Sequence, residues 1–135
     1  MNDFSGMDAL YRDFILDHYR NPRNAGTIED ADASFEDINP LCGDKVRVDL
    51  RIRDGVVEDV KFKGRGCAIS QASTSLLTEE IKGKTVADID RIGKDEVLAN
   101  LGINISAARL KCALLGLKVL KQALALKYEP SDEEA

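Results

Sequence analysis

The stretch that decides the fold is residues 45–63, KVRVDLRIRDGVVEDVKFK, which predicts two β-strands joined by a tight turn. In residues 45–52, Val, Leu and Ile alternate strictly with charged residues, a period of two that is typical of a strand with one buried face. Asp54-Gly55 is the strongest short-range signal for a hairpin turn. Residues 56–63 then return with Val60 and Phe62 on one face. The sequence therefore predicts an antiparallel hairpin.

Helical periodicity lies on both sides of this hairpin. Before it, residues 5–20 carry an apolar stripe and Asn21-Pro22 provides a stop. Residues 31–39 are polar and indicate no more than a short edge strand. After the hairpin, residues 64–66 (Gly-Arg-Gly) break the strand pattern and helix spacing begins. The further helices expected run from Ile69 to just before Gly83, from Thr85 to about Ile92, over residues 95–100 and over residues 106–128.

This order of elements, one helix, then strands, then several helices, is typical of the α+β class, in which helices cover one face of an antiparallel sheet. The 135 residues suit a single domain. We expect that domain to span residues 1–128. The remaining residues 129–135, EPSDEEA, are expected to form a solvated acidic tail.

Composition excludes several classes of function. The net charge of −5 argues against binding to a nucleic-acid backbone and favours a partner with a basic docking surface. No apolar run approaches the roughly 20 residues that span a bilayer, so no membrane association is expected. The N-terminus lacks the basic and apolar regions of a secretory signal. We therefore expect a cytoplasmic protein.

The three cysteines lie in three different contexts. Cys42 lies in a loop, Asn-Pro-Leu-Cys-Gly-Asp, just before the first hairpin strand, and Cys67 lies where the second strand ends and a helix begins. A hairpin brings the start of its first strand beside the end of its second, so Cys42, Asp44 and Cys67 are expected to meet at one end of the sheet. Cys112, on the last helix, joins them only if that helix packs across the same end.

Three thiolates and one carboxylate make a complete tetrahedral ligand set for Zn²⁺. The same set suits a small iron–sulfur cluster. An odd number of widely spaced cysteines in a reducing compartment favours such thiolate chemistry over disulfides. The following helix gives Cys67 an N-terminal position that stabilises a thiolate. Asp44 is a hard ligand for a soft site, so we expect it to make the site labile.

Each of these residues also has a purely structural interpretation. Cys112 on an apolar helix is as readily a packing residue, and Cys67 could pack at a helix start. Asp44 could be no more than a turn or strand-entry residue. His18, the only histidine, is expected to be a surface or helix-end residue rather than a ligand. The serines and threonine at 73–75 are expected to bond helix backbone groups.

At these residues the sequence resembles the iron–sulfur cluster assembly family that includes IscU, the N-terminal domain of NifU, and SufU. The resemblance implies a three-stranded antiparallel sheet with helices packed on it. It also implies that Cys42, Asp44, Cys67 and Cys112 converge on one partly exposed site. The matching stretches are residues 18–24 (HYRNPRN), 39–44 (NPLCGD), 64–73 (GRGCAISQAS) and 109–113 (RLKCA).

The resemblance also implies a function. Members of the family receive persulfide sulfur from a cysteine desulfurase and either assemble a [2Fe–2S] cluster or relay the sulfur onwards. We therefore expect an iron–sulfur cluster assembly protein that binds Zn²⁺ or a transient [2Fe–2S] cluster. Its expected partners are the desulfurase and downstream apo-proteins or other assembly proteins. The alternatives are a zinc-dependent sulfurtransferase that builds no cluster and a structural zinc-binding interaction module.

The motifs are divided between two branches of the family. Gly-Cys-Ala-Ile-Ser at 66–70 and Lys111 before the last cysteine are similar to SufU, whereas IscU-like scaffolds place a histidine before that cysteine. The chain nevertheless lacks the insertion usual in SufU between Cys67 and Cys112. By resemblance to SufU, Cys42 is expected to accept the persulfide sulfur, and Cys112 is the alternative acceptor if the protein behaves as a scaffold.

Overall fold

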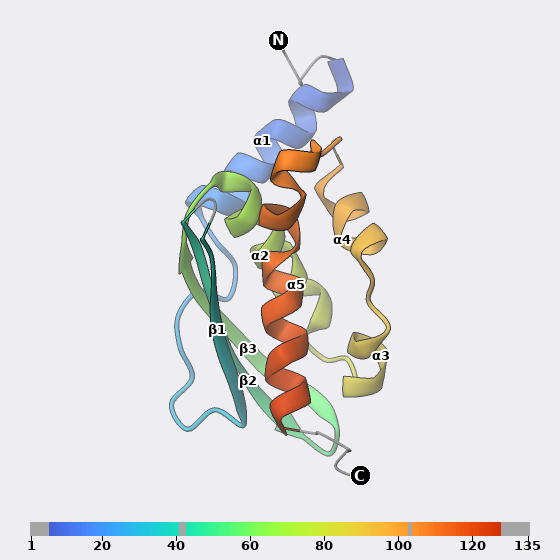
Figure 1. Ribbon diagram of the computed structural model, residues 1–135. Helices are drawn as coiled ribbons and strands as arrows, with labels where there is room; N and C mark the ends of the chain where they lie inside the picture. Colours follow the sequence, from blue (N-terminus) through green and yellow to red (C-terminus); the bar gives the residue numbers. More distant parts are fainter. Residues whose placement is uncertain (1–5, 41–42, 103, 128–135) are drawn as a thin grey trace.

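The chain folds into a three-stranded sheet with five helices on one side of it (Figure 1). The computed structural model describes residues 6–40, 43–102 and 104–127. The elements in chain order are α1 (Gly6–Arg20), β1 (Ala33–Asn39), β2 (Asp44–Arg53), β3 (Val56–Arg65), α2 (Ala68–Ile81), α3 (Val86–Asp90), α4 (Lys94–Leu101) and α5 (Ala107–Lys127). The predicted α+β class is confirmed.

The hairpin forms as the sequence predicts. β2 and β3 pair antiparallel, and the turn residues Asp54 and Gly55 have φ values of 53° and 77°, as a two-residue type I′ turn requires. β1 pairs antiparallel with the other side of β2, so the strand order is β1-β2-β3 and the expected edge strand is present. Both hairpin strands are longer than predicted, since β2 starts at Asp44 and β3 continues to Arg65.

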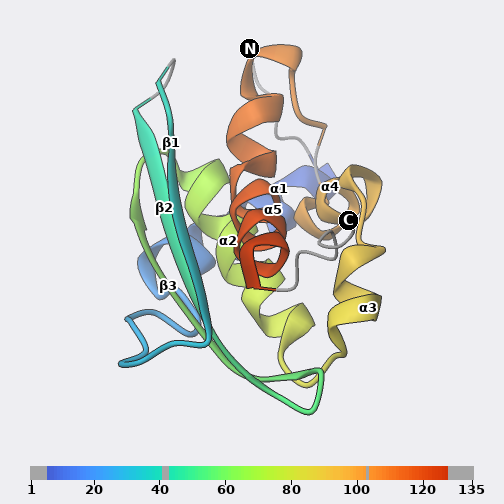
Figure 2. The same ribbon diagram turned by 60° about the horizontal axis from the view of Figure 1, so that its bottom comes forward.

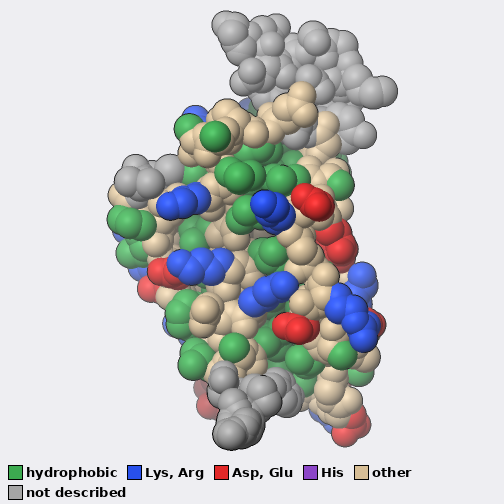
Figure 3. Space-filling view, turned by 45° about the vertical axis from the view of Figure 1, so that its right-hand side comes forward, with side chains coloured by type: hydrophobic (Ala, Val, Ile, Leu, Met, Phe, Trp, Pro, Cys, Tyr) green, Lys and Arg blue, Asp and Glu red, His purple; other side chains and the backbone are tan. Residues whose placement is uncertain are grey.

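The elements form three layers, because each buries one face: the sheet, the pair α2 and α5, and then α3 and α4 (Figure 2). Val46, Val48 and Leu50 of β2 face the helices and are almost fully buried. Against them lie α2 and α5, while α3 and α4 pack on the outer side of that helix pair (Figure 2). On the helical side of the molecule, charged side chains of both signs are intermixed (Figure 3). No helix in the described ranges is long and apolar enough to cross a membrane.

α2 and α5 approach each other closely because one glycine leaves room for a side chain of the other helix. A Cβ atom on Gly116 of α5 would overlap Oγ1 of Thr74 on α2. One turn earlier on α5, the Ala113 carbonyl accepts a hydrogen bond of 2.6 Å from Ser73 Oγ. This pair of contacts fixes α5 lengthwise on α2, and Cys112 lies beside them.

His18 corrects one expectation from the sequence. It lies in the last turn of α1, as expected, but it is buried rather than on the surface, with 2% of its area exposed. Its Nδ1 lies 2.7 Å from Ser75 Oγ of α2, and that oxygen also accepts a hydrogen bond from the backbone N–H of Arg23. The ring of Phe14 packs edge-on against it. Burial, with a smaller contribution from Arg23, holds the pKa of His18 below its ordinary value.

The other expectations on element boundaries differ from the structure by a few residues. Thr85 caps α3 through its side chain, and the helix ends at Asp90 instead of the expected Ile92. Of the threonine and serines at 73–75, Thr74 and Ser73 bond helix backbone groups as expected, through Ser70 O of α2 and Ala113 O of α5, whereas Ser75 Oγ contacts His18. The predicted acidic tail lies outside the described residues.

Candidate metal centre

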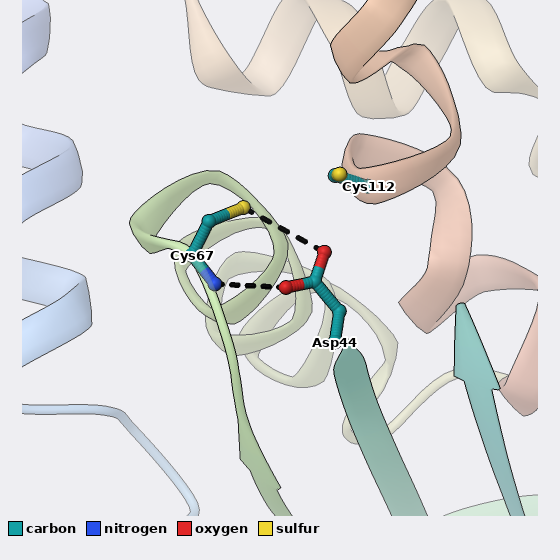
Figure 4. A group of neighbouring side chains, drawn as sticks. All are labelled: Asp44, Cys67 and Cys112. Carbon is teal, nitrogen blue, oxygen red and sulfur yellow. Dashed lines mark hydrogen bonds between the residues drawn. The ribbon is translucent and has the colours of Figure 1, made fainter. Parts of the chain in front are cut away.

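Asp44 is the first residue of β2 and belongs to the buried face of that strand. It pairs with Asn39 at the end of β1, and 1% of its area is exposed. Its Oδ1 accepts a hydrogen bond of 2.9 Å from the backbone N–H of Cys67, and its Oδ2 lies 3.7 Å from Cys67 Sγ (Figure 4). The carboxylate therefore points across the end of the sheet toward the start of α2.

Gly66 makes this position of the carboxylate possible. Its φ of +139° is a conformation that side-chain-bearing residues rarely adopt, and a Cβ atom there would overlap the Asp44 carboxylate. The chain thus turns from β3 into α2 directly over Asp44. This clearance was not recognised from the sequence, where Gly66 was interpreted only as a break in the strand pattern.

Cys67 is the N-cap residue of α2. Its backbone is extended, with φ −72° and ψ 160°, and its Sγ accepts from the N–H of Ser70 at 3.5 Å. The partial positive charge of a helix N-terminus favours an anion at this position. Cys67 is half-buried, so it is the more accessible of the two described thiols.

Cys112 reaches the same place from α5. It is almost fully buried, with 1% of its area exposed, and the Asn39 side chain donates to its Sγ across 3.9 Å. The condition stated from the sequence, that the last helix must pack across this end of the sheet, is fulfilled. Asn39 was not recognised as part of the site, although it stands next to Pro40 in the cysteine loop.

Ligand atoms of Asp44, Cys67 and Cys112 all lie within 4.8 Å of one another. Ligands about 2.3 Å from a tetrahedral zinc ion are separated by about 3.8 Å, so small adjustments would bring these three into coordinating positions. One oxygen and two sulfur donors suit Zn²⁺ or iron. Three of the four predicted ligands thus converge. The fourth, Cys42, lies outside the described residues.

Comparison with known protein families matches residues 10–134 to the NifU-like N terminal domain. The chain belongs to this family. Among its relatives, the zinc-dependent sulfurtransferase SufU of Bacillus subtilis is 38% identical, covering 90% of this chain and 93% of the relative. The iron–sulfur cluster assembly scaffold protein IscU 1 of Archaeoglobus fulgidus is also 38% identical, covering 85% and 74%.

Solved structures of the NifU-like family have the same fold. A nitrogen-fixing NifU-like protein (N-terminal) from Brucella abortus superimposes with a TM-score of 0.73 at 26% identity, covering 97% of this chain and all of that one. A putative iron–sulfur cluster assembly scaffold protein for the SUF system from Fervidobacterium islandicum gives a TM-score of 0.67 at 34% identity, covering 88% and 99%. The resemblance to the NifU, IscU and SufU proteins and the three-stranded sheet expected from it are therefore confirmed.

Proposed function

We propose that the chain is an iron–sulfur cluster assembly protein that accepts persulfide sulfur from a cysteine desulfurase and holds a transient [2Fe–2S] cluster. Its binding site would consist of Cys42, Asp44, Cys67 and Cys112. The observation that carries the proposal is the approach of the buried Asp44 carboxylate to two thiols, with the three donor atoms within 4.8 Å of one another. The scaffold relatives of the same family support it.

Sulfur acceptance needs a thiolate that can reach the donor. The thiolate attacks the outer sulfur of the donor persulfide, R–S–SH; the S–S bond of the donor breaks, R–S⁻ leaves, and a new S–S bond forms on the acceptor cysteine. We assign this role first to Cys42. Cys112 is the alternative acceptor. It is 1% exposed, so its Sγ can contact a protein-bound donor only if the segments packed around it move.

Once sulfur has been accepted, Asp44, Cys67 and Cys112 help to hold the iron–sulfur cluster. A bound metal ion would supply the positive charge that keeps the thiols deprotonated. Cys67 contributes a thiol at a helix N-terminus, and Cys112 contributes one from the buried side of α5. The Asp44 oxygen is a harder donor than a fourth cysteine sulfur, which favours release of an iron–sulfur cargo to a recipient protein.

A second candidate is a relay in which Zn²⁺ occupies the site and sulfur passes on without cluster assembly. The observation favouring it is Lys111, an exposed cation directly before Cys112, together with the Bacillus subtilis relative described as a zinc-dependent sulfurtransferase. Lys111 would attract an anionic persulfide to the site. The downstream recipient would be an apo-protein or another assembly protein.

Anaerobic reconstitution with a cysteine desulfurase, cysteine and ferrous iron separates the two candidates. A scaffold gives stoichiometric [2Fe–2S] absorption, and Cys67→Ser abolishes it. Asp44→Ala slows the transfer of the cluster to an apo-ferredoxin. A relay instead raises desulfurase turnover with zinc bound and shows no cluster absorption. Asp95→Ala, which removes an exposed carboxylate on α4, is the matched control and leaves both signals unchanged. The absence of both signals in the wild-type protein would refute the proposal and favour a structural zinc module.

A further inference from the structure

The outer face of the sheet, opposite the helices, carries a local concentration of positive charge. Alternate residues of β3 point outward, and three in succession are cations: Lys61, Lys63 and Arg65. On β2, Arg47 lies directly opposite Lys63 and Lys45 directly opposite Arg65. Five cations, with Asp49 opposite Lys61, thus occupy three neighbouring rungs of the sheet in a chain whose net charge is −5. The helical side, where both signs are intermixed, has no such arrangement in the view of Figure 3.

The cations on β3 are the ones left without a counter-charge. Lys45 pairs with Glu36 at 3.4 Å, and Arg47 pairs with the buried Asp49 at 2.9 Å. In the part of the chain that the structure describes, Lys61, Lys63 and Arg65 form no ion pair. Two of these side chains, Lys63 and Arg65, are also exposed. Their charge is therefore available to a ligand.

Four of the five cations, all but Lys61, border a concave surface, which we call the basic groove. The groove has a volume of about 250 Å³ and is lined by Thr27, Glu36, Lys45, Arg47, Lys63, Gly64 and Arg65. Its far wall includes Thr27, which belongs to the segment between α1 and β1 that crosses the outer face of the sheet. Asp49 fixes that segment, because it accepts a hydrogen bond from the N–H of Ile28; it also accepts one from Ser34 Oγ on β1. Although burial raises the pKa of Asp49, these bonds and that from Arg47 outweigh burial and keep its carboxyl ionised.

The basic groove lies at the same end of the sheet as the candidate metal centre. Lys45 follows Asp44 on β2, and Arg65 precedes Cys67 by two residues. Side chains of neighbouring strand residues point to opposite faces, so the groove and the thiols are separated by the thickness of the sheet. A molecule held in the groove would lie beside the rim of the thiol site without blocking it.

We propose that the basic groove docks an extended acidic segment of a partner protein. Side chains two residues apart on β3 are about 6.8 Å apart along the strand, which matches the spacing of alternate side chains in an extended peptide. A single small anion would instead need cations converging on one point. A nucleic-acid duplex would extend past the groove onto the acidic remainder of the surface. Net charge alone favoured a basic partner; the uneven distribution of charge points to an acidic one at this face.

The test uses the full chain and a fluorescein-labelled peptide of alternating glutamate and serine, with binding followed by fluorescence anisotropy at low and at physiological ionic strength. We expect salt-sensitive binding that the double variant K63E/R65E weakens by about tenfold or more, since it removes two ion pairs and adds two repulsions. The neutral variant K63Q/R65Q should give an intermediate loss. The matched control is R91E/K94E, which makes the same change of charge at two exposed positions, the C-cap of α3 and the first residue of α4, and should bind as the wild type does.

Three outcomes would overturn the proposal. Equal weakening by K63E/R65E and R91E/K94E would mean that the peptide responds to net charge and not to the groove. A glutamine–serine peptide that binds as well as the charged one would exclude charge recognition. An oligonucleotide that binds the groove more tightly than the acidic peptide would identify a nucleic-acid site instead. Circular dichroism and thermal unfolding of each variant confirm that the fold is intact. None of these readouts requires sulfur transfer, so the proposed function can fail while this proposal stands.

Discussion

Replacing Gly66 with alanine tests whether the Asp44 carboxylate is held where the structure has it. The added methyl group would occupy space taken by that carboxylate, and alanine would also have to adopt a φ of +139°. Backbone strain of this kind costs about 1–3 kcal/mol. Displacing a packed neighbour costs roughly another 1–3 kcal/mol. We therefore expect the free energy of unfolding to fall by about 2–6 kcal/mol.

Thermal unfolding of the metal-free protein measures this loss. With an unfolding entropy of about 2.1 cal/mol/K per residue, 135 residues give a change in melting temperature of about 3.5 °C per kcal/mol. G66A should thus melt about 7–21 °C below the wild type. In a competition with a chromophoric chelator, its zinc affinity should fall by about 10- to 100-fold, the range typical of changes that misplace a metal ligand.

Gly83 provides the matched control. Its φ is +90°, but no atom lies within 4 Å of the position where a Cβ would be added. Gly83→Ala therefore adds backbone strain without displacing a neighbour, and it should lose about 1–3 kcal/mol of stability and keep the zinc affinity of the wild type. The role assigned to Gly66 is refuted if G66A loses no more stability than G83A and binds zinc as tightly as G83A does. Gly66 would then not be needed to leave room for the Asp44 carboxylate.

Two further predictions concern the helix contacts. Gly116→Ala should destabilise the protein by about 1–3 kcal/mol in urea unfolding, because its methyl group would overlap Thr74 Oγ1. Alanine has a higher helix propensity than glycine, which alone would raise the stability. A gain in stability would therefore contradict the close approach of α2 and α5. Since the pKa of His18 is lowered in the folded state, the unfolded chain binds more protons as the pH falls below about 6.5, and stability should decrease there by at most about 1.4 kcal/mol per pH unit. His18→Gln should flatten this dependence in urea titrations of the metal-free protein at several pH values, and an unchanged slope would exclude His18 as its source.

Local sequence signals predicted the sheet well because the determinants of a hairpin are close together in the chain. Alternation in β2 and the Asp54-Gly55 turn act over a few residues, and the structure has both. The burial of His18 could not be predicted in this way. Its partner Ser75 lies 57 residues further along, and no periodicity in either helix indicates that the two side chains meet. A histidine near a helix end looks the same in sequence whether it is solvated or enclosed.

The residues of the candidate site also differ in how far local sequence signals could place them. The hairpin was sufficient to predict that Asp44 and Cys67 lie together, whereas Cys112 depended on how α5 packs. In the structure that packing rests on the contact of Gly116 with Thr74, and the placement of Asp44 rests on Gly66. Both determinants are the absence of a side chain. Donor atoms can be recognised from residue type, but the room that lets them converge is a property of the packed structure, and for this reason glycine substitutions test the site as directly as substitutions of the ligands.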